Sequence, residues 1–135
     1  MSVAAILRRL GYQVTTVPPT TRIVEVARLL AERRTSAVLV ADAADQLLGI
    51  VSERDIVRSL AANGDRTLEM TAGQLMTRAL KTATPRTSIT EAMQAMTTGG
   101  FRHLPVLDDG VLVGLVSITD VVRARVMQDQ GVLAG

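Results

Sequence analysis

The stretch that decides the fold is Gly49-Ile50-Val51-Ser52-Glu53-Arg54-Asp55, which recurs as Gly114-Leu115-Val116-Ser117-Ile118-Thr119-Asp120. The two stretches share their Gly, Val, Ser and Asp, and their aspartates stand 65 positions apart. Upstream, at an offset of 66 positions, Pro19 matches Pro85, Ile23 matches Ile89 and Glu25 matches Glu91. Matches at a nearly fixed offset indicate an internal repeat, so two copies of one unit of about 55–60 residues make up most of the chain.

Each copy has the same predicted order of elements: strand, helix, strand, strand, helix. In the first copy these are residues 14–17, 22–34, 37–41, 47–51 and 53–62, and in the second they are 80–83, 89–98, 104–107, 112–116 and 118–127. The first helix is predicted from Ile23, Val26, Ala27 and Leu30, which have the i, i+3, i+4, i+7 spacing of one helix face. The fold class is therefore α/β (α+β in some schemes), with tandem β-α-β-β-α repeats.

The repeat also sets the expected domain organisation. We expect a lead-in helix at residues 1–12, a first repeat at 13–64, a linker at 65–72 and a second repeat at 73–130. A unit of about 60 residues buries too little surface for a full core of its own. We therefore expect the two repeats to pack through their sheets with pseudo-two-fold symmetry, leaving a pair of clefts between them.

Composition excludes several classes of function. The 135 residues are 47% hydrophobic and 21% charged, as in an ordinary globular domain. The chain has no cysteine, which excludes disulfides, thiolate metal sites and cysteine nucleophiles. Aromatic residues are only 1% and the net charge is only +2, with arginines spread along the chain, so nucleic-acid binding is disfavoured.

The sequence also bears on location and on metals. No apolar run reaches the ~18–20 residues that span a bilayer. The basic pair Arg8-Arg9, interpreted as a solvated helix end, follows a short apolar stretch, which is the reverse of a secretory signal. We expect a soluble cytoplasmic protein without membrane association. Turn aspartates are interpreted as partners of turn backbone groups, so no metal site is predicted.

Further motifs carry a family resemblance. They are Phe101-Arg102-His103-Leu104-Pro105-Val106, Gln74-Leu75-Met76-Thr77 and the lead-in Ile6-Leu7-Arg8-Arg9. Together with the two Ser-x-x-Asp stretches, they make each repeat resemble a cystathionine-β-synthase-type (CBS) domain, and the chain resembles a stand-alone CBS-domain pair, or Bateman module. The resemblance implies a homodimeric, non-catalytic sensor without a catalytic cofactor. It also implies an adenine ligand (AMP, ADP, ATP or S-adenosylmethionine, with or without magnesium) in the inter-repeat clefts.

Ser52 with Asp55, and Ser117 with Asp120, stand three residues apart where a strand meets a helix. One interpretation is a helix cap, in which the Ser accepts from an amide and the Asp is favoured by the helix dipole. The other, which the resemblance implies, is that the Asp accepts both ribose hydroxyls while the Ser helps to hold ribose or phosphate. A carboxylate suits a vicinal diol because it has two acceptor oxygens.

Arg102 and His103 are interpreted either as a solvated strand edge or as phosphate ligands. The resemblance implies that they join Asp55, whereas their counterparts Ser36 and Ala37 join Asp120. Because Ser36 and Ala37 carry no charge, we expect the Asp120 cleft to hold phosphate less strongly.

Four other residues are weaker candidates. Thr16 and Thr82 precede the proline turns; they either fill strands as β-branched residues or, as the resemblance implies, lie against the adenine. Arg54 and Thr119 stand inside the Ser-x-x-Asp stretches, where they could reach phosphate, although Arg54 could equally be a surface charge.

Three functions compete. The first is a ligand-sensing regulatory module whose nucleotide changes the packing that an unidentified partner protein reads. The second is an enzyme, which is disfavoured because the sequence shows no catalytic triad, zinc motif or P-loop. The third is a structural or nucleic-acid-binding dimerisation module without a nucleotide ligand.

Overall fold

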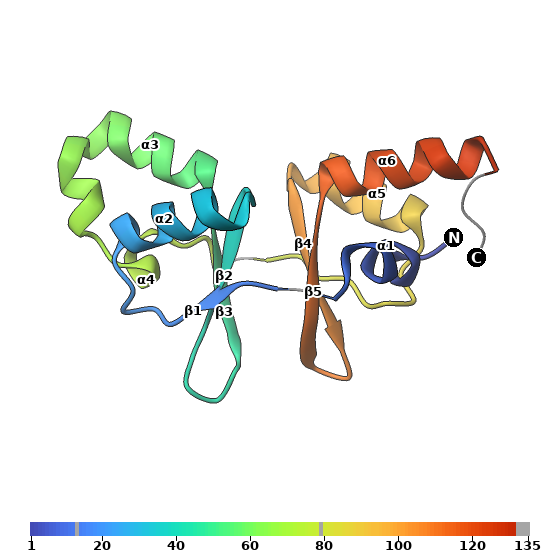
Figure 1. Ribbon diagram of the computed structural model, residues 1–135, viewed down its shortest axis with the longest axis horizontal. Coiled ribbons are helices and arrows are strands. Elements are labelled where there is room, and N and C mark those ends of the chain that lie inside the picture. Colours follow the sequence, from blue (N-terminus) through green and yellow to red (C-terminus); the bar gives the residue numbers. More distant parts are fainter. Residues whose placement is uncertain (13, 79, 132–135) are drawn as a thin grey trace. The chain divides into compact units, whose positions relative to one another are not determined.

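The computed structural model describes residues 1–12, 14–78 and 80–131, and it divides into two compact units (Figure 1). The first unit comprises residues 15–80, and the second unit comprises residues 1–14 together with 81–135. Each unit contains helices and one small sheet, which confirms the predicted mixed α/β class. Among the described residues, no helix is long and apolar enough to cross a membrane.

The first unit is built on a three-stranded sheet. Its elements are β1 (Thr16–Val17), α2 (Ile23–Arg33), β2 (Ala37–Ala41), β3 (Leu47–Ser52), α3 (Glu53–Asn63), the 3₁₀ helix η1 (Gly64–Glu69) and α4 (Ala72–Leu75). Strand β2 is central, with β1 parallel and β3 antiparallel to it. All five β2 residues are buried, as a short continuous apolar run predicts. Val26 of α2 joins Val38 and Val51 of the sheet in one fully buried cluster.

The second unit repeats this plan with a smaller sheet. Its elements are α1 (Val3–Leu10), α5 (Ile89–Gly99), β4 (His103–Asp108), β5 (Val111–Ser117) and α6 (Ile118–Asp129). Strands β4 and β5 are antiparallel, and the strand expected at residues 80–83 is reduced to one parallel bridge between Ala83 and Val106. Leu7, Ile89 and Leu104 belong to the core cluster and are at most 1% exposed.

The segment that precedes each repeat in the sequence belongs to the unit of the other repeat. In the second unit, the Val3 amide of α1 donates to the Thr87 carbonyl at 2.7 Å. In the first unit, the Ala72 amide of α4 donates to the Thr21 carbonyl at the same distance, 2.7 Å. The compact units are thus 15–80 and 1–14 with 81–135, and the sequence-based division into 1–12, 13–64, 65–72 and 73–130 stays a prediction. These contacts join residues far apart in the chain, and local sequence patterns do not indicate them.

Residues 65–72, expected as a linker, fold as part of the first unit. They form most of η1, and α4 begins at their end. Thr67 is fully buried, and its hydroxyl lies 2.7 Å from the hydroxyl of Ser59 on α3. The side-chain Nδ2 of Asn63 also donates to the Ser59 hydroxyl, at 3.2 Å. Because buried hydroxyls need partners, this polar stretch is a packed contact and not a solvated connection.

A glycine in β3 and another in β5 let the preceding segments, around Met76 and around Leu7, approach the sheets. A Cβ on Gly49 would lie 2.7 Å from both the Met76 sulfur and the Thr77 carbonyl oxygen. A Cβ on Gly114 would lie 2.6 Å from the Leu7 Cδ2 atom, and its next neighbours are at 3.6 Å. Both distances are far inside ordinary van der Waals contact, so each position requires the absence of a side chain.

We expect Gly49→Ala to destabilise the protein more than Gly114→Ala. At Gly49 one of the clashing atoms is a backbone oxygen that also accepts a hydrogen bond from the Ile50 amide, so it cannot move without breaking the bridge. At Gly114 the obstacle is the end of the Leu7 side chain. Overpacking of this kind costs about 1–3 kcal/mol, with Gly49→Ala at the upper end. Urea unfolding of both variants measures the difference, and an equal or smaller loss at Gly49 contradicts it.

Helix α5 begins with a complete capping box. The Glu91 amide donates to the Ser88 hydroxyl at 3.0 Å, and the Ser88 amide donates to the Glu91 carboxylate at 3.1 Å. The hydrogen bond from the Ser88 backbone, helped by the Ser88 side chain, lowers the pKa of Glu91 below its ordinary value. Because the folded-state pKa is lowered, the charged carboxylate stabilises the fold above the unfolded-state pKa, and this contribution is lost as pH falls through the folded-state pKa.

We therefore expect Glu91→Gln to be less stable than the wild type at neutral pH and to approach it in acid. Glutamine retains the acceptor of the capping box and lacks the titrating charge. Urea midpoints of both proteins at about pH 7 and about pH 3 give the comparison. A stability gap that stays constant or widens in acid contradicts the assignment.

Candidate functional site

The first candidate site lies where β3 meets α3. Ser52 is the N-cap residue of α3, and its hydroxyl accepts from the Asp55 amide at 3.2 Å. The Asp55 Oδ2 atom accepts from the Ser52 amide at 2.8 Å and from the Ser52 hydroxyl at 2.9 Å. The capping interpretation of this Ser-x-x-Asp stretch is confirmed. The reciprocal bonds also fix the direction of the carboxylate.

The second candidate site repeats this geometry where β5 meets α6. The Ser117 hydroxyl accepts from the Asp120 amide at 3.2 Å, and the Asp120 Oδ2 atom accepts from the Ser117 amide at 2.8 Å. Asp55 and Asp120 are both half-buried. In the described part of the chain, all hydrogen bonds accepted by these two carboxylates go to Oδ2. Among the described contacts, Oδ1 of each aspartate thus accepts no hydrogen bond.

Ser36 and Ala37 lie beside the first junction. The Glu53 amide at the start of α3 donates to the Ser36 carbonyl at 2.9 Å. Ala37 pairs with Ser52 in the antiparallel register of β2 and β3. The structure thus brings both residues next to the cap of their own repeat.

Arg102 and His103 hold the equivalent places beside the second junction. The Ile118 amide donates to the Arg102 carbonyl at 2.8 Å, and His103 pairs with Ser117 across β4 and β5. The Arg102 side chain is exposed, whereas His103 is half-buried. His103 is thus the first residue of β4, one position earlier than expected. The assignment of Arg102 and His103 to Asp55 of the other repeat stays a prediction.

The four weaker candidates from the sequence are all exposed. Thr16 pairs with Leu39 in the sheet, and Thr82 directly precedes the Ala83 bridge; both threonines are exposed. Arg54 and Thr119 stand in the first turns of α3 and α6, and both are exposed. Thr119 also lines a shallow apolar hollow along α6. Among the described residues, no hydrogen bond or ion pair joins these four side chains to the Ser-Asp pairs.

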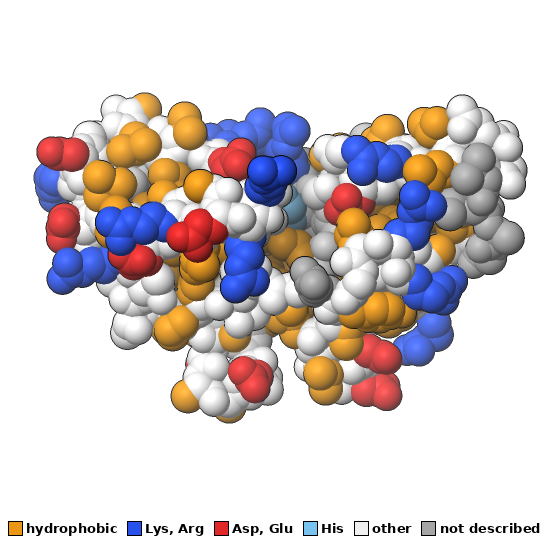
Figure 2. All heavy atoms as spheres, in the orientation of Figure 1, with side chains coloured by type: hydrophobic (Ala, Val, Ile, Leu, Met, Phe, Trp, Pro, Cys, Tyr) orange, Lys and Arg blue, Asp and Glu red, His pale blue; other side chains and the backbone are white. Residues whose placement is uncertain are grey.

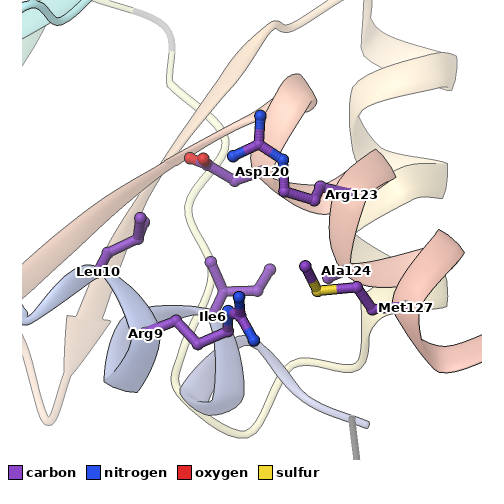
Figure 3. A pocket seen from close by; sticks show the side chains of 7 residues that line it. All are labelled: Ile6, Arg9, Leu10, Asp120, Arg123, Ala124 and Met127. Atoms are coloured by element: carbon purple, nitrogen blue, oxygen red, sulfur yellow. The ribbon is translucent and has the colours of Figure 1, made fainter. Parts of the chain in front are cut away.

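A pocket of about 230 Å³ lies between α1 and α6 of the second unit (Figure 3). Its lining is Ile6, Arg9 and Leu10 from α1, and Asp120, Arg123, Ala124 and Met127 from α6. The sequence analysis identified only Asp120 of this set as a candidate site residue. The pocket adds two cationic side chains to the surroundings of that carboxylate.

The sequence contains a pattern that indicates one of these two cations, Arg123. Both repeats contain Asp-x-x-Arg, with Asp55 and Arg58 in the first and Asp120 and Arg123 in the second. Residues three apart on a helix lie on the same face, so each arginine is placed one turn after the capping aspartate. Arg9 has no such local signal, because its proximity to Asp120 depends on the packing of α1 in the second unit.

The candidate site has no metal-binding character in the described residues. No group of three or more histidine, aspartate or glutamate side chains is placed to hold a metal ion there.

Comparisons with known proteins identify the fold. A family model for the CBS domain matches the chain twice, at residues 3–62 and 72–127. Among curated proteins, the mitochondrial CBS domain-containing protein CBSX3 of Arabidopsis thaliana is 37% identical over 106 residues. The match covers 76% of this chain and 52% of CBSX3, so the chain spans about half the length of that relative. The comparisons indicate no enzyme family.

Solved structures match nearly the whole chain. The CBS-domain containing protein ATU1752 from Agrobacterium tumefaciens is 38% identical with a TM-score of 0.89, covering 93% of this chain and 99% of that one. The protein PAE2072 from Pyrobaculum aerophilum, complexed with AMP, is 27% identical with a TM-score of 0.82 over 96% and 97% of the two chains. The CBS domain pair of protein MJ0100, in complex with 5′-methylthioadenosine and S-adenosyl-L-methionine, is 26% identical with a TM-score of 0.84 over 95% and 98%.

The two matches to the family model together cover most of the sequence, and the solved neighbours have the same architecture. This chain therefore belongs to the CBS-domain family.

Proposed function

We propose that this chain is a non-catalytic regulatory module that binds an adenine nucleotide (AMP, ADP or ATP) or S-adenosylmethionine through Asp55 and Asp120. The observation that carries the proposal is the repeated junction at which a capping aspartate keeps one carboxylate oxygen for a ligand. Structural neighbours with the same fold bind AMP, or 5′-methylthioadenosine and S-adenosyl-L-methionine, which supports an adenosine-containing ligand.

The junction suits a ribose in a specific way. The Oδ1 atom of each aspartate can accept from a ribose hydroxyl while Oδ2 stays bonded to the serine amide. Hydrogen bonds to a charged acceptor are roughly twice as strong as neutral ones. Since the capping box fixes the carboxylate before the ligand arrives, little side-chain entropy is lost on binding.

The proposed role of these carboxylates is regulation rather than catalysis. A ligand bound at a helix entrance shifts an equilibrium between two packings only by its different affinity for each. A partner protein that reads one of the packings would then respond to the nucleotide. Figure 2 shows basic side chains on both units with acidic ones among them on this face, which gives no support to a basic stripe for nucleic acid.

We expect Asp55→Asn and Asp120→Asn each to weaken adenine-nucleotide binding about tenfold or more at their own site, because a charge-assisted bond is replaced by a neutral one. Asparagine retains an oxygen for the serine amide, so the folds should stay close in stability. Isothermal titration with AMP, ADP, ATP and S-adenosylmethionine, with a product assay on the same samples, measures binding and turnover.

The matched control for these variants is Glu91→Gln, which alters the capping box of α5 outside the candidate site. It should leave the affinities unchanged. Full affinity in the double aspartate variant contradicts the site. Turnover of the nucleotide contradicts the non-catalytic assignment, and DNA retention without any adenylate binding contradicts the whole proposal.

We also propose that the module forms a homodimer through the exposed apolar faces of α3 and α6. Val57 and Val122 occupy matching positions on these helices and are 63% and 45% exposed, and Val126 on the next turn of α6 is 50% exposed. An apolar hollow runs along α6 beside Val122 and Val126. A two-fold contact buries the same surface on both partners, which suits a face that recurs on two matched helices.

We expect the double variant Val57→Asp with Val122→Asp to shift the protein toward monomer, because it places unpaired charges in the contact. Val111→Asp is the matched control, since Val111 is equally exposed but lies on the β5 hairpin. Analytical ultracentrifugation over a range of concentrations distinguishes the forms. A monomeric wild type, or an unaffected dimer in the double variant, argues against this interface.

A further inference from the structure

The pocket of the second unit is formed by two facing helix stripes. Ile6, Arg9 and Leu10 have the i, i+3, i+4 spacing on α1, and Asp120, Arg123 and Ala124 have the same spacing on α6. Figure 3 shows these side chains around one hollow, with Asp120 at the start of α6 and Arg123 one turn further on. The wall between the charged groups is apolar, from Ile6, Leu10, Ala124 and Met127.

The charges of this pocket are not neutralised by their surroundings. Arg9 and Arg123 are exposed, and within the described residues neither has an ion pair or a side-chain hydrogen bond. By contrast, Arg125 on the same helix pairs with Asp129 at 3.5 Å and donates to Thr90 at 3.3 Å. Two free guanidinium groups beside one carboxylate leave the pocket with a net positive charge. Such groups match the geometry of phosphate oxygens.

The first unit also has arginines at the matching positions. Arg58 corresponds to Arg123 at the 65-residue offset, and Arg78 corresponds to Arg9 because each follows by two residues the side chain at a strand glycine, Met76 at Gly49 and Leu7 at Gly114. However, Arg78 donates to the Gly73 carbonyl at 3.4 Å. At the position of Ala124 the first unit has Ser59, which is covered by η1. The doubly cationic pocket that the structure describes belongs to the second unit.

We propose that Arg9 and Arg123 bind the phosphate of the nucleotide whose ribose Asp120 holds, so that this site selects nucleoside phosphates over neutral nucleosides. The inference rests on the proposed function and assigns two phosphate ligands to it. At about 230 Å³ the pocket is smaller than the ~300–1,000 Å³ of sites that enclose a whole drug-sized ligand. It fits the phosphate end of a nucleotide, with the base lying outside.

This assignment reverses an expectation drawn from the sequence. Ser36 and Ala37 carry no charge, which predicted weak phosphate binding at Asp120. Arg9 and Arg123 supply the missing cations from α1 and α6. The lead-in helix then becomes part of the binding site and not only a packing element.

The test compares AMP with adenosine in the Asp55→Asn background, which isolates the Asp120 site. Arg9→Gln, Arg123→Gln and their combination are the test variants; all three change exposed side chains and should fold as the wild type does. Arg8→Gln and Arg125→Gln are matched controls, since each is a neighbour on the same helix that does not line the pocket. Isothermal titration at low and high salt gives the affinities.

We expect each test variant to weaken AMP binding about tenfold or more and to change adenosine binding less than about twofold. The control variants should leave the affinities for AMP and for adenosine unchanged. Raised salt should reduce the preference of the Asp55→Asn protein for AMP over adenosine. An unchanged ratio of AMP to adenosine affinity in the combined variant overturns the assignment of the arginines and leaves the proposed function intact. Failure of the unmutated protein to bind any adenylate overturns both.

Discussion

The turn from strand to helix after each hairpin is the constraint on which the rest of the structure depends. At this turn a serine and an aspartate three residues later hold each other through the backbone amides of the helix start. The same bonds end the strand, begin the helix and direct one carboxylate. Seven consecutive residues set the strand end, the helix start and the carboxylate direction. A copy of the unit therefore keeps the geometry of its aspartate carboxylate. Packing beyond the turn could then diverge between copies without disturbing either carboxylate.

The parts of the fold that local sequence patterns control were predictable. Helix α2 follows from apolar spacing, and α5 follows from the Ser88–Glu91 capping box. The elements that were missed depend on contacts between distant residues. Residues 65–72 are polar and short, yet Thr67 is held in the core by Ser59. The lead-in helix α1 gives a clear helical pattern, but only its contacts with residues 85–89 show which unit it belongs to.

The candidate site likewise contains residues that a local motif indicates and residues that only tertiary packing brings together. Asp55 and Asp120 could be identified because a repeated Ser-x-x-Asp stretch is visible in the chain, and Arg123 could have been identified from the repeated Asp-x-x-Arg. Arg9 could not, since it looks like any basic residue at a helix end. It lines the pocket because α1 packs against α6, a consequence of the Gly114 gap that admits Leu7. A tertiary contact, and not a motif, brings this cation to the site.

The two equivalent carboxylates have different surroundings in the described residues. At the first junction the Ser52 hydroxyl donates to Asp55, so that hydroxyl and one carboxylate oxygen already satisfy each other. At the second junction the described hydrogen bonds between Asp120 and Ser117 are the two that backbone amides donate. Asp120 also shares its pocket with two arginines, whereas the matching arginine Arg78 is engaged with a backbone carbonyl. The second junction therefore has more donors for an anionic ligand. Under the proposed function, such an imbalance would allow the two sites to fill at different nucleotide concentrations.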